Sequence, residues 1–288
     1  MLRVTQLSDT HFSTDEGGSH GGMGYDTDET AGEVLAHAFG GAAPDLVVIT
    51  GDVADHGRAD EYHKAAAALE ALPAPVLTWP GNHDFHVPFQ AVLPRSGIAM
   101  QRTYRIGPWL FVFVDTNHDG REVAAGGALV DRPDRVEESN GRLGPAELAW
   151  VHSVIEHTDA AHVFLWVHHP PFMPGVFSQP AYDAEMSELL RSNDKVRGVA
   201  GGHVHTARVD VQFDRPVHVC PAFTVNIDLD EYQLLPPGYR TFEFGDDGTV
   251  ASTAHLLDDP RWPRRAMTEL GIRYLQGALS WDDLRGDR

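Results

Sequence analysis

Short apolar runs that end in polar clusters recur along the chain, and each predicts a buried β-strand. They lie at Leu2–Leu7, Leu46–Thr50, Val76–Trp79, Leu110–Val114, Val163–Val167 and Val196–Ala200. Helical patterns separate them, at Thr30–Phe39, Ala59–Leu72, Ala146–His157 and Ala184–Arg191. Strands that alternate with helices favour an α/β fold with largely parallel pairing in this part of the chain.

After Gly202 the strand-like segments follow one another without helices between them, which predicts antiparallel pairing. They are Ala207–Phe213, Val217–Val219, Phe223–Leu229, Tyr239–Phe244 and Thr249–Leu256. We therefore expect two mixed sheets packed together with helices outside. The tail, residues 258–288, has an apolar face formed by Met267, Leu270, Tyr274, Leu275 and Trp281. It is predicted to dock on the core as a helix, with a homodimer contact as the alternative.

The charge of the chain restricts its partners. The 288 residues carry a formal net charge of −20, and only two lysines occur, Lys64 and Lys195. A nucleic-acid polymer or an anionic membrane surface requires clustered basic residues, so both are excluded as main partners. A small phosphorylated substrate remains compatible with this charge if a strongly positive group binds it locally.

Other features of the composition predict a cytoplasmic protein. Cys220 is the single cysteine and lies in an apolar stretch, which indicates a buried structural thiol and excludes an intrachain disulfide. Apolar runs stay shorter than the roughly 18 residues of a membrane span. The first residues lack the basic and apolar regions of a secretory signal.

Chemically capable side chains follow five of the predicted strands. These post-strand motifs are Asp9-Thr10-His11, Gly51-Asp52, Gly81-Asn82-His83-Asp84, His168-His169-Pro170 and Gly202-His203-Val204-His205. In α/β sheets such loops meet at the carboxyl ends of the strands. Imidazole and carboxylate together suit Mn, Fe or Zn, and their number exceeds what one ion needs. The sequence therefore predicts two metal ions that share a carboxylate and supply the missing positive charge.

Each motif alone also has a purely structural explanation. Asp9-Thr10-His11 is compatible with a capped turn, Gly51-Asp52 is a common turn, and Asn82-His83-Asp84 fits an Asx turn. The paired histidines are more specific, and the ordered set favours the metal site. His20, in a Gly-rich loop, is a candidate substrate contact, with a solvated histidine as the alternative. Asp115-Thr116-Asn117 is either an outer group of the site or a turn.

This ordered set of motifs resembles the calcineurin-like metallophosphoesterases. The compact forms Leu7-Ser8-Asp9-Thr10-His11, Thr50-Gly51-Asp52 and Gly202-His203-Val204-His205 are similar to those of the bacterial class III cyclic-nucleotide phosphodiesterases. The motifs span residues 9–205, and the general pattern extends to about residue 250. The resemblance implies a four-layer α-β-β-α sandwich with a dinuclear centre. Residues 1–257 would be the catalytic domain and 258–288 a C-terminal extension.

The resemblance also implies roles for individual residues. Asp9, His11 and His205 would bind the first metal; Asn82, His168 and His203 would bind the second; Asp52 would bridge both. In the family the ligand histidine lies two positions before the proline, which selects His168 over His169. His83 would face the phosphate, with its ring oriented by Asp84, and the substrate would contact Asn82, His83 and His205. The ions would be divalent or mixed-valence, with Mn or Fe preferred over Zn or Co.

The predicted reaction is hydrolysis of a small phosphodiester, with 3′,5′-cyclic nucleotides such as cAMP as the leading substrates. A hydroxide between the metals would attack phosphorus in line, and protonated His83 would stabilise the developing charge. Glycerophosphodiesters and nucleoside-diphosphate compounds are alternatives, because the motifs do not encode the pocket contacts that distinguish these substrates. Such contacts are expected from Ser13–Asp28 and Tyr232–Tyr239. A non-catalytic scaffold would lack some ligands or His83, and all are present.

Overall fold

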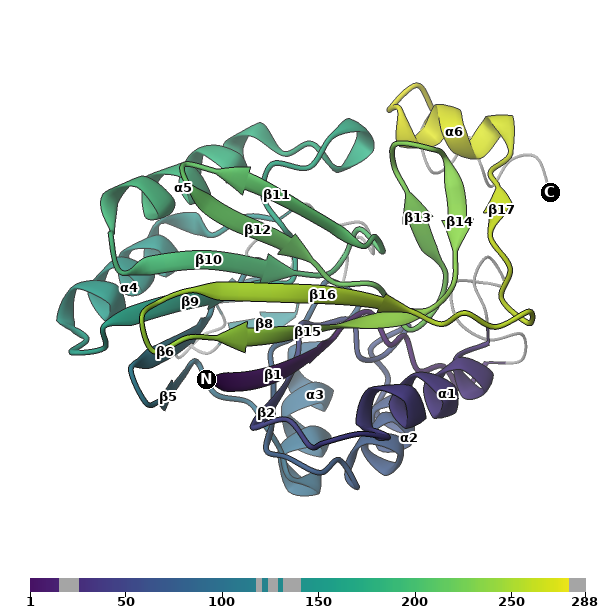
Figure 1. Ribbon diagram of the computed structural model, residues 1–288, viewed down its shortest axis with the longest axis horizontal. Helices are drawn as coiled ribbons and strands as arrows, with labels where there is room; N and C mark the ends of the chain where they lie inside the picture. Colours follow the sequence, from purple (N-terminus) through teal and green to yellow (C-terminus); the bar gives the residue numbers. More distant parts are fainter. Residues whose placement is uncertain (16–25, 118–120, 124–128, 132–140, 280–288) are drawn as a thin grey trace.

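Two six-stranded sheets stack face to face in the computed structural model, with helices on both outer sides (Figure 1). The structure describes residues 1–15, 26–117, 121–123, 129–131 and 141–279. This arrangement confirms the predicted α/β class and the α-β-β-α layers.

The first sheet has the strand order β16-β15-β1-β2-β3-β4. In that order the strands are Val250–Leu256, Gly238–Phe244, Leu2–Leu7, Leu46–Ile49, Val76–Thr78 and Ile98–Ala99. Strands β1 to β4 pair in parallel, and β15 and β16 are added antiparallel. The outer face packs on α1 (Thr27–Phe39), α2 (Ala59–Leu69) and α3 (His86–Val92) through one apolar cluster. The 3₁₀ helix η2 (Leu93–Ser96) follows α3.

The second sheet has the order β11-β12-β10-β9-β6-β5. Its strands are Arg208–Gln212, Arg215–Val219, Val196–Gly201, His162–Trp166, Trp109–Phe113 and Thr103–Ile106. Helices α4 (Gly144–His157) and α5 (Pro180–Ser192) cover its outer face. Strand β12 pairs antiparallel with β11 but parallel with β10, so the pairing after Gly202 is mixed rather than purely antiparallel.

Aromatic rings fill the space between the sheets. Trp109, Phe111, Phe164 and Trp166 of the second sheet meet Phe244 of the first, with ring centroids 4.9 to 6.4 Å apart. All five are essentially inaccessible to solvent. Rings at these separations interlock in offset and edge-to-face contacts, which fix the sheets relative to each other.

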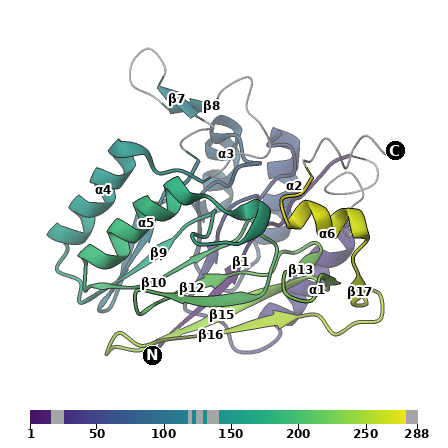
Figure 2. The ribbon, with the colours of Figure 1, turned by 90° about the horizontal axis from the view of Figure 1, so that it is seen from above.

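Two smaller sheets complete the fold. One contains β13 (Asn226–Asp228), β14 (Gln233–Leu235) and β17 (Arg265–Ala266); the other pairs β7 (Arg121–Val123) with β8 (Leu129–Asp131). Helix α6 (Glu269–Leu275) follows β17 and lies beside β13 in both views (Figures 1 and 2).

The sequence pattern did not predict α3, β4, β5, β14 or β17, because these elements have only two to seven residues. Helix α1 starts at Thr27, three residues before the helical pattern predicted from Thr30. The carboxylate of Asp26 explains this start, since it accepts a hydrogen bond from the amide of Asp28 and caps the helix.

Candidate metal centre

The five post-strand motifs meet at one place. The first sheet contributes the loops after β1, β2 and β3, and the second contributes those after β9 and β10. Within the described residues, four groups of three side chains have ligand atoms within 4.8 Å of one another. The groups are Asp9, His11 and His205; Asp9, Asp52 and His168; His11, Asp52 and His83; His168, His169 and His203.

The backbone at this site is unusual. Five of the seven predicted ligands have positive φ angles of 43° to 63°: Asp9, His11, Asp52, His203 and His205. Only nine non-glycine residues in the described part of the chain have positive φ. This conformation is uncommon for L-residues and costs about 1–3 kcal/mol each, so its clustering is typical of a functional site.

Two glycines allow the loops to approach so closely. Gly51 has φ +90°, and a Cβ atom there would lie 2.7 Å from His168 Nδ1. At Gly202 a Cβ atom would lie 2.3 Å from Asp9 Oδ2. Both distances are shorter than any carbon contact tolerates, so a larger residue at either position would push the ligand loops apart.

The first predicted cluster is compact. His11 Nε2 lies 3.3 Å from His205 Nε2, which is in turn 3.4 Å from Asp9 Oδ1. Asp52 Oδ2 is 3.7 Å from His11 Nε2. Two imidazole nitrogens and two carboxylates thus face one small volume, and this donor set suits a divalent transition metal.

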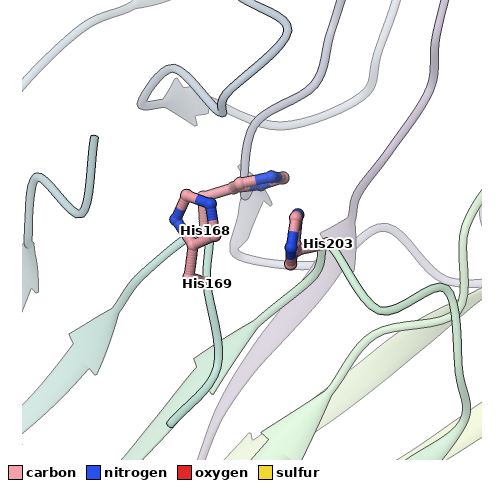
Figure 3. Close-up of side chains that lie close together, drawn as sticks. All are labelled: His168, His169 and His203. Atoms are coloured by element: carbon pink, nitrogen blue, oxygen red, sulfur yellow. The ribbon is translucent and has the colours of Figure 1, made fainter. Parts of the chain in front are cut away.

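The second predicted cluster shares Asp52 with the first. Asp52 Oδ2 is 3.2 Å from His168 Nε2, which also lies 2.9 Å from Asn82 Oδ1. Figure 3 shows the rings of His168, His169 and His203 converging from the ends of β9 and β10. The position of Asp52 between His11 and His168 is what a bridging carboxylate requires.

His83 lies at the edge of this centre. Its amide donates to Asp52 Oδ1 (2.8 Å), and its Nδ1 lies 2.7 Å from the Asp55 carbonyl oxygen. Asp84 accepts hydrogen bonds from the amides of Val53, Ala54 and Gly81 and from a tyrosine hydroxyl. These bonds hold the loops after β2 and β3 together, and the role of Asp84 in orienting the His83 ring stays a prediction.

Groups that hold the rings were missed by the sequence analysis. His11 Nδ1 bonds to the buried Asp55 carboxylate at 3.1 Å. His168 Nδ1 lies 2.7 Å from the Thr50 carbonyl oxygen, and His205 Nδ1 lies 3.3 Å from that of Val225. Each contact leaves Nε2 directed at the centre. An acid three residues after Asp52, in the same loop, was the available signal for Asp55.

His169 is also part of the arrangement, although the sequence analysis set it aside. Its Nδ1 lies 2.8 Å from the Thr116 hydroxyl, and its ring centroid is 4.4 Å from that of His203. Asn117 donates to the carbonyl oxygen of Pro80 at 2.8 Å. Thr116 and Asn117 therefore contact residues within two positions of predicted ligands, which favours the outer-group interpretation of Asp115-Thr116-Asn117 over a simple turn.

The electrostatics of the centre favour positive charge. Burial raises the pKa of Asp52, but the facing histidines, His168 first, outweigh burial and bring it well below its usual range. Burial lowers the pKa of His168, but the charge and hydrogen bond of Asp52, together with the charge of Asp9, outweigh burial and raise it to about 9. For His203, burial and the charge of His168 lower the pKa to about 3. The ionised carboxylates therefore attract positive charge, which a bound cation would supply in place of the proton on His168.

Two other candidate residues have different outcomes. Cys220 is fully buried, and burial raises the pKa of its thiol, which confirms the expected structural cysteine. His20 lies outside the described residues. In the described part of the chain, no helix combines the length and apolar character that crossing a membrane requires.

The fold and this site define a class of enzyme, and comparison with known proteins identifies it. Residues 2–207 match the family model of the calcineurin-like phosphoesterases, and the chain belongs to that family. The predicted class, a metal-dependent phosphoric diester hydrolase, is confirmed. The donor set around Asp52 fits the dinuclear divalent metal centre that this fold implies.

Three relatives are each 26% identical to this chain. They are a probable cyclic nucleotide phosphodiesterase from Synechococcus (89% of this chain, 93% of the relative), the 3′,5′-cyclic adenosine monophosphate phosphodiesterase CpdA of Escherichia coli (91% and 92%), and a probable glycerophosphodiester phosphodiesterase GpdQ from Arcobacter nitrofigilis (88% and 93%).

Solved structures share the fold at lower identity. A dimetal phosphatase from Danio rerio has a TM-score of 0.59 at 16% identity, covering 81% of this chain and 94% of its own. GAP50, described as the anchor in the inner membrane complex of Plasmodium, has a TM-score of 0.59 at 11% identity, covering 93% and 89%. These likenesses support the predicted metallophosphoesterase architecture.

Proposed function

We propose that this chain hydrolyses small phosphodiesters, with 3′,5′-cyclic nucleotides, cAMP first, as its substrates. The observation that carries the proposal is the position of Asp52, whose Oδ2 lies 3.7 Å from His11 Nε2 and 3.2 Å from His168 Nε2. The cyclic nucleotide phosphodiesterases of Synechococcus and E. coli, which align over about nine-tenths of the chain, support the substrate class.

The residue roles are part of the same proposal. Asp9, His11 and His205 hold one ion, Asn82, His168 and His203 hold the other, and Asp52 contacts both. Bound ions of this kind supply positive charge for a phosphate and lower the pKa of water. Mn or Fe are the first candidates, and Zn or Co the next.

His83 is the proposed catalytic residue that is not a ligand. Its Nδ1 lies 2.7 Å from the Asp55 carbonyl oxygen, a contact that fixes the direction of the ring, and Nε2 is the atom proposed to face the substrate. From there the imidazolium would donate to a phosphate oxygen as negative charge develops and would protonate the leaving oxygen. Asn82 and His205 are the other proposed substrate contacts among the described residues.

A substrate panel tests the proposal. The full chain is loaded separately with Mn²⁺, Fe²⁺, Zn²⁺ and Co²⁺ and assayed with cAMP, cGMP, glycerophosphocholine, ADP-ribose and bis(p-nitrophenyl) phosphate. We expect kcat/KM for cAMP to exceed that for glycerophosphocholine by about tenfold or more, a ratio that differential pocket contacts can supply. The reverse order would overturn the cyclic-nucleotide assignment.

Glycerophosphodiester hydrolysis is the second candidate, because the Arcobacter relative matches this chain at the same identity. Preferred hydrolysis of glycerophosphocholine in the panel would establish it. A non-catalytic role on the same fold is the third possibility that the panel tests. A chain that binds two metal equivalents and yet leaves bis(p-nitrophenyl) phosphate intact would show that the site is structural.

A further inference from the structure

The C-terminal helix is connected to the candidate metal centre by direct contacts. Helix α6 packs against the 3₁₀ helix η4 (Gly175–Phe177). A Cβ atom at Gly175 would lie only 2.2 Å from the carbonyl oxygen of Leu275, so the two backbones touch at this point. At the other end of η4, the Phe177 ring meets the His203 ring edge-on, with centroids 5.9 Å apart. One continuous path therefore leads from Leu275 to His203.

A second path leads to His205. The amide of Ile227 in β13 donates to the carbonyl oxygen of His205 at 2.6 Å, and the preceding Val225 carbonyl lies against His205 Nδ1. Strand β13 pairs with β14, and β14 pairs with β17 immediately before α6. The small sheet thus connects the C-terminal segment to the second histidine of the Gly202–His205 loop.

The C-terminal segment is anchored at both of its ends. Trp262 is 2% exposed and belongs to the apolar cluster beneath the first sheet, whereas Leu275 is 5% exposed and its backbone lies against η4, which follows β9 of the second sheet. In between, the Met267 amide donates to the Tyr232 carbonyl (3.0 Å); directly after Leu275, Gln276 Nε2 donates to the Tyr232 hydroxyl (3.2 Å). Residues 262–276 therefore pass from the side of the first sheet to that of the second beside the Gly202–His205 loop.

We propose that residues 262–276 are a positioning strap for the metal centre. The strap holds His203 through η4 and His205 through β13, and so sets the affinity of the site for its ions. This inference rests on the proposed function, since it takes both histidines as metal ligands. Residues of the strap act through other groups and are not catalytic. Outer contacts of this kind typically change metal affinity by about 10- to 100-fold.

The test uses the full chain and Mn²⁺ alone, with the dissociation constant measured by calorimetric titration. Leu275→Ala and Phe177→Ala should each raise the dissociation constant about tenfold. Both substitutions act on the same path. The dissociation constant of the double variant should therefore equal that of the single variant with the larger effect, and should not rise by the product of the two effects. Leu275→Met should bind Mn²⁺ with the affinity of the wild-type chain. Leu270→Ala is the matched control, because Leu270 lies on the same helix but is 39% exposed.

The thermal midpoint of the metal-free chain, measured in parallel, identifies variants that fail to fold. If Leu275→Ala does so, Tyr232→Phe replaces it, since it removes only the hydroxyl that meets Gln276 and should weaken Mn²⁺ binding about twofold. If Leu275→Ala and Phe177→Ala bind Mn²⁺ as tightly as Leu270→Ala, the strap proposal is wrong. It is also wrong if the two effects multiply in the double variant. In either case the proposed function is unaffected. A wild-type chain that binds no Mn²⁺ and hydrolyses no diester would overturn the proposed function and the strap with it.

Discussion

The two sheets contribute different chemistry to the same centre. The first sheet supplies every oxygen donor among the predicted ligands, namely Asp9, Asp52 and Asn82, whereas the second supplies only imidazoles. Negative charge therefore comes from one side of the sandwich alone, whereas nitrogen donors come from both, with His11 on the side of the first sheet. Substitution of Asp9 or Asp52 changes the charge that attracts cations, while substitution of a second-sheet histidine removes a donor and leaves that charge in place.

The sheets also differ in how the rings are held. His11 is held by a side chain, the carboxylate of Asp55, while His168 and His205 are held by the main-chain carbonyls of Thr50 and Val225. A single substitution can remove the first kind of support, whereas the second kind belongs to the backbone.

The largest effect is expected at Asp52, where the two predicted clusters meet. Asp52→Ala removes the one carboxylate shared by both, so we expect both ions and all measurable hydrolysis to be lost. Metal content after dialysis, determined by mass spectrometry, is the measurement. Asp159→Ala is the control, because that carboxylate is 95% exposed in a surface ion pair. Retention of two metal equivalents by Asp52→Ala would disprove the bridging role.

His83 should separate metal binding from catalysis. His83→Ala leaves both predicted ligand sets intact but removes the group proposed to face the phosphate. We expect kcat to fall about 10²- to 10⁴-fold, as is typical for loss of a general acid, with metal content unchanged. Loss of metal in proportion to loss of activity would show instead that His83 is a ligand.

Asp55 tests the difference in ring support directly. Asp55→Ala removes the hydrogen bond that orients His11, so affinity for the ion at the first cluster should fall about 10- to 100-fold. The second cluster, in which His168 is held by the main-chain carbonyl of Thr50, should keep its affinity. Two-step titration with Mn²⁺ measures both. Equal weakening of the two steps would show that Asp55 supports the whole centre rather than one half.

The smallest effect is expected at His218, where the two sheets pack far from the ligand loops, and it concerns stability rather than activity. His218 of β12 is buried and meets Ser252 of β16, and burial together with the charge of Arg240 lowers its pKa from 6.5 to about 3. Below pH 6.5 the unfolded chain binds this proton and the folded chain does not. Stability is therefore lost as the pH falls, by about 2 kcal/mol between pH 6.5 and 5.

Urea unfolding of the wild type and His218→Gln at both pH values measures this contribution. The variant is expected to be less stable throughout, because it disturbs a packed interior, but its stability should fall less between the two pH values. Parallel pH dependences in the two chains would contradict the assignment to His218.

The centre was predictable because its ligands follow the strands that are easiest to recognise. Strands β2 and β9 are buried along their whole length and read as apolar runs, β1 and β10 are mostly buried, and parallel neighbours place the following loops at one edge. Because Asp9, Asp52, His168 and His203 each come shortly after one of these strands, the pairing of the strands brings the four side chains together.

The surroundings of the centre were not predictable in this way. Strand β14 has three residues and finds its partner β17 some thirty residues later, so its apolar content carries no local signal. The supports from Thr50 and Val225 are main-chain carbonyls, which every residue possesses, and sequence cannot reveal them. Asp55 was visible in the sequence, but its partner His11 is 44 positions away.

The left-handed backbone at Asp9, His11, Asp52, His203 and His205 has a consequence for protein engineering. Glycine would relax the conformation at each position, as stabilising designs often do, yet it would delete the donor atom at the same time. Conformational stability and activity are therefore opposed at five positions of one site. Selection of this chain for thermal stability alone should accumulate inactive variants there first.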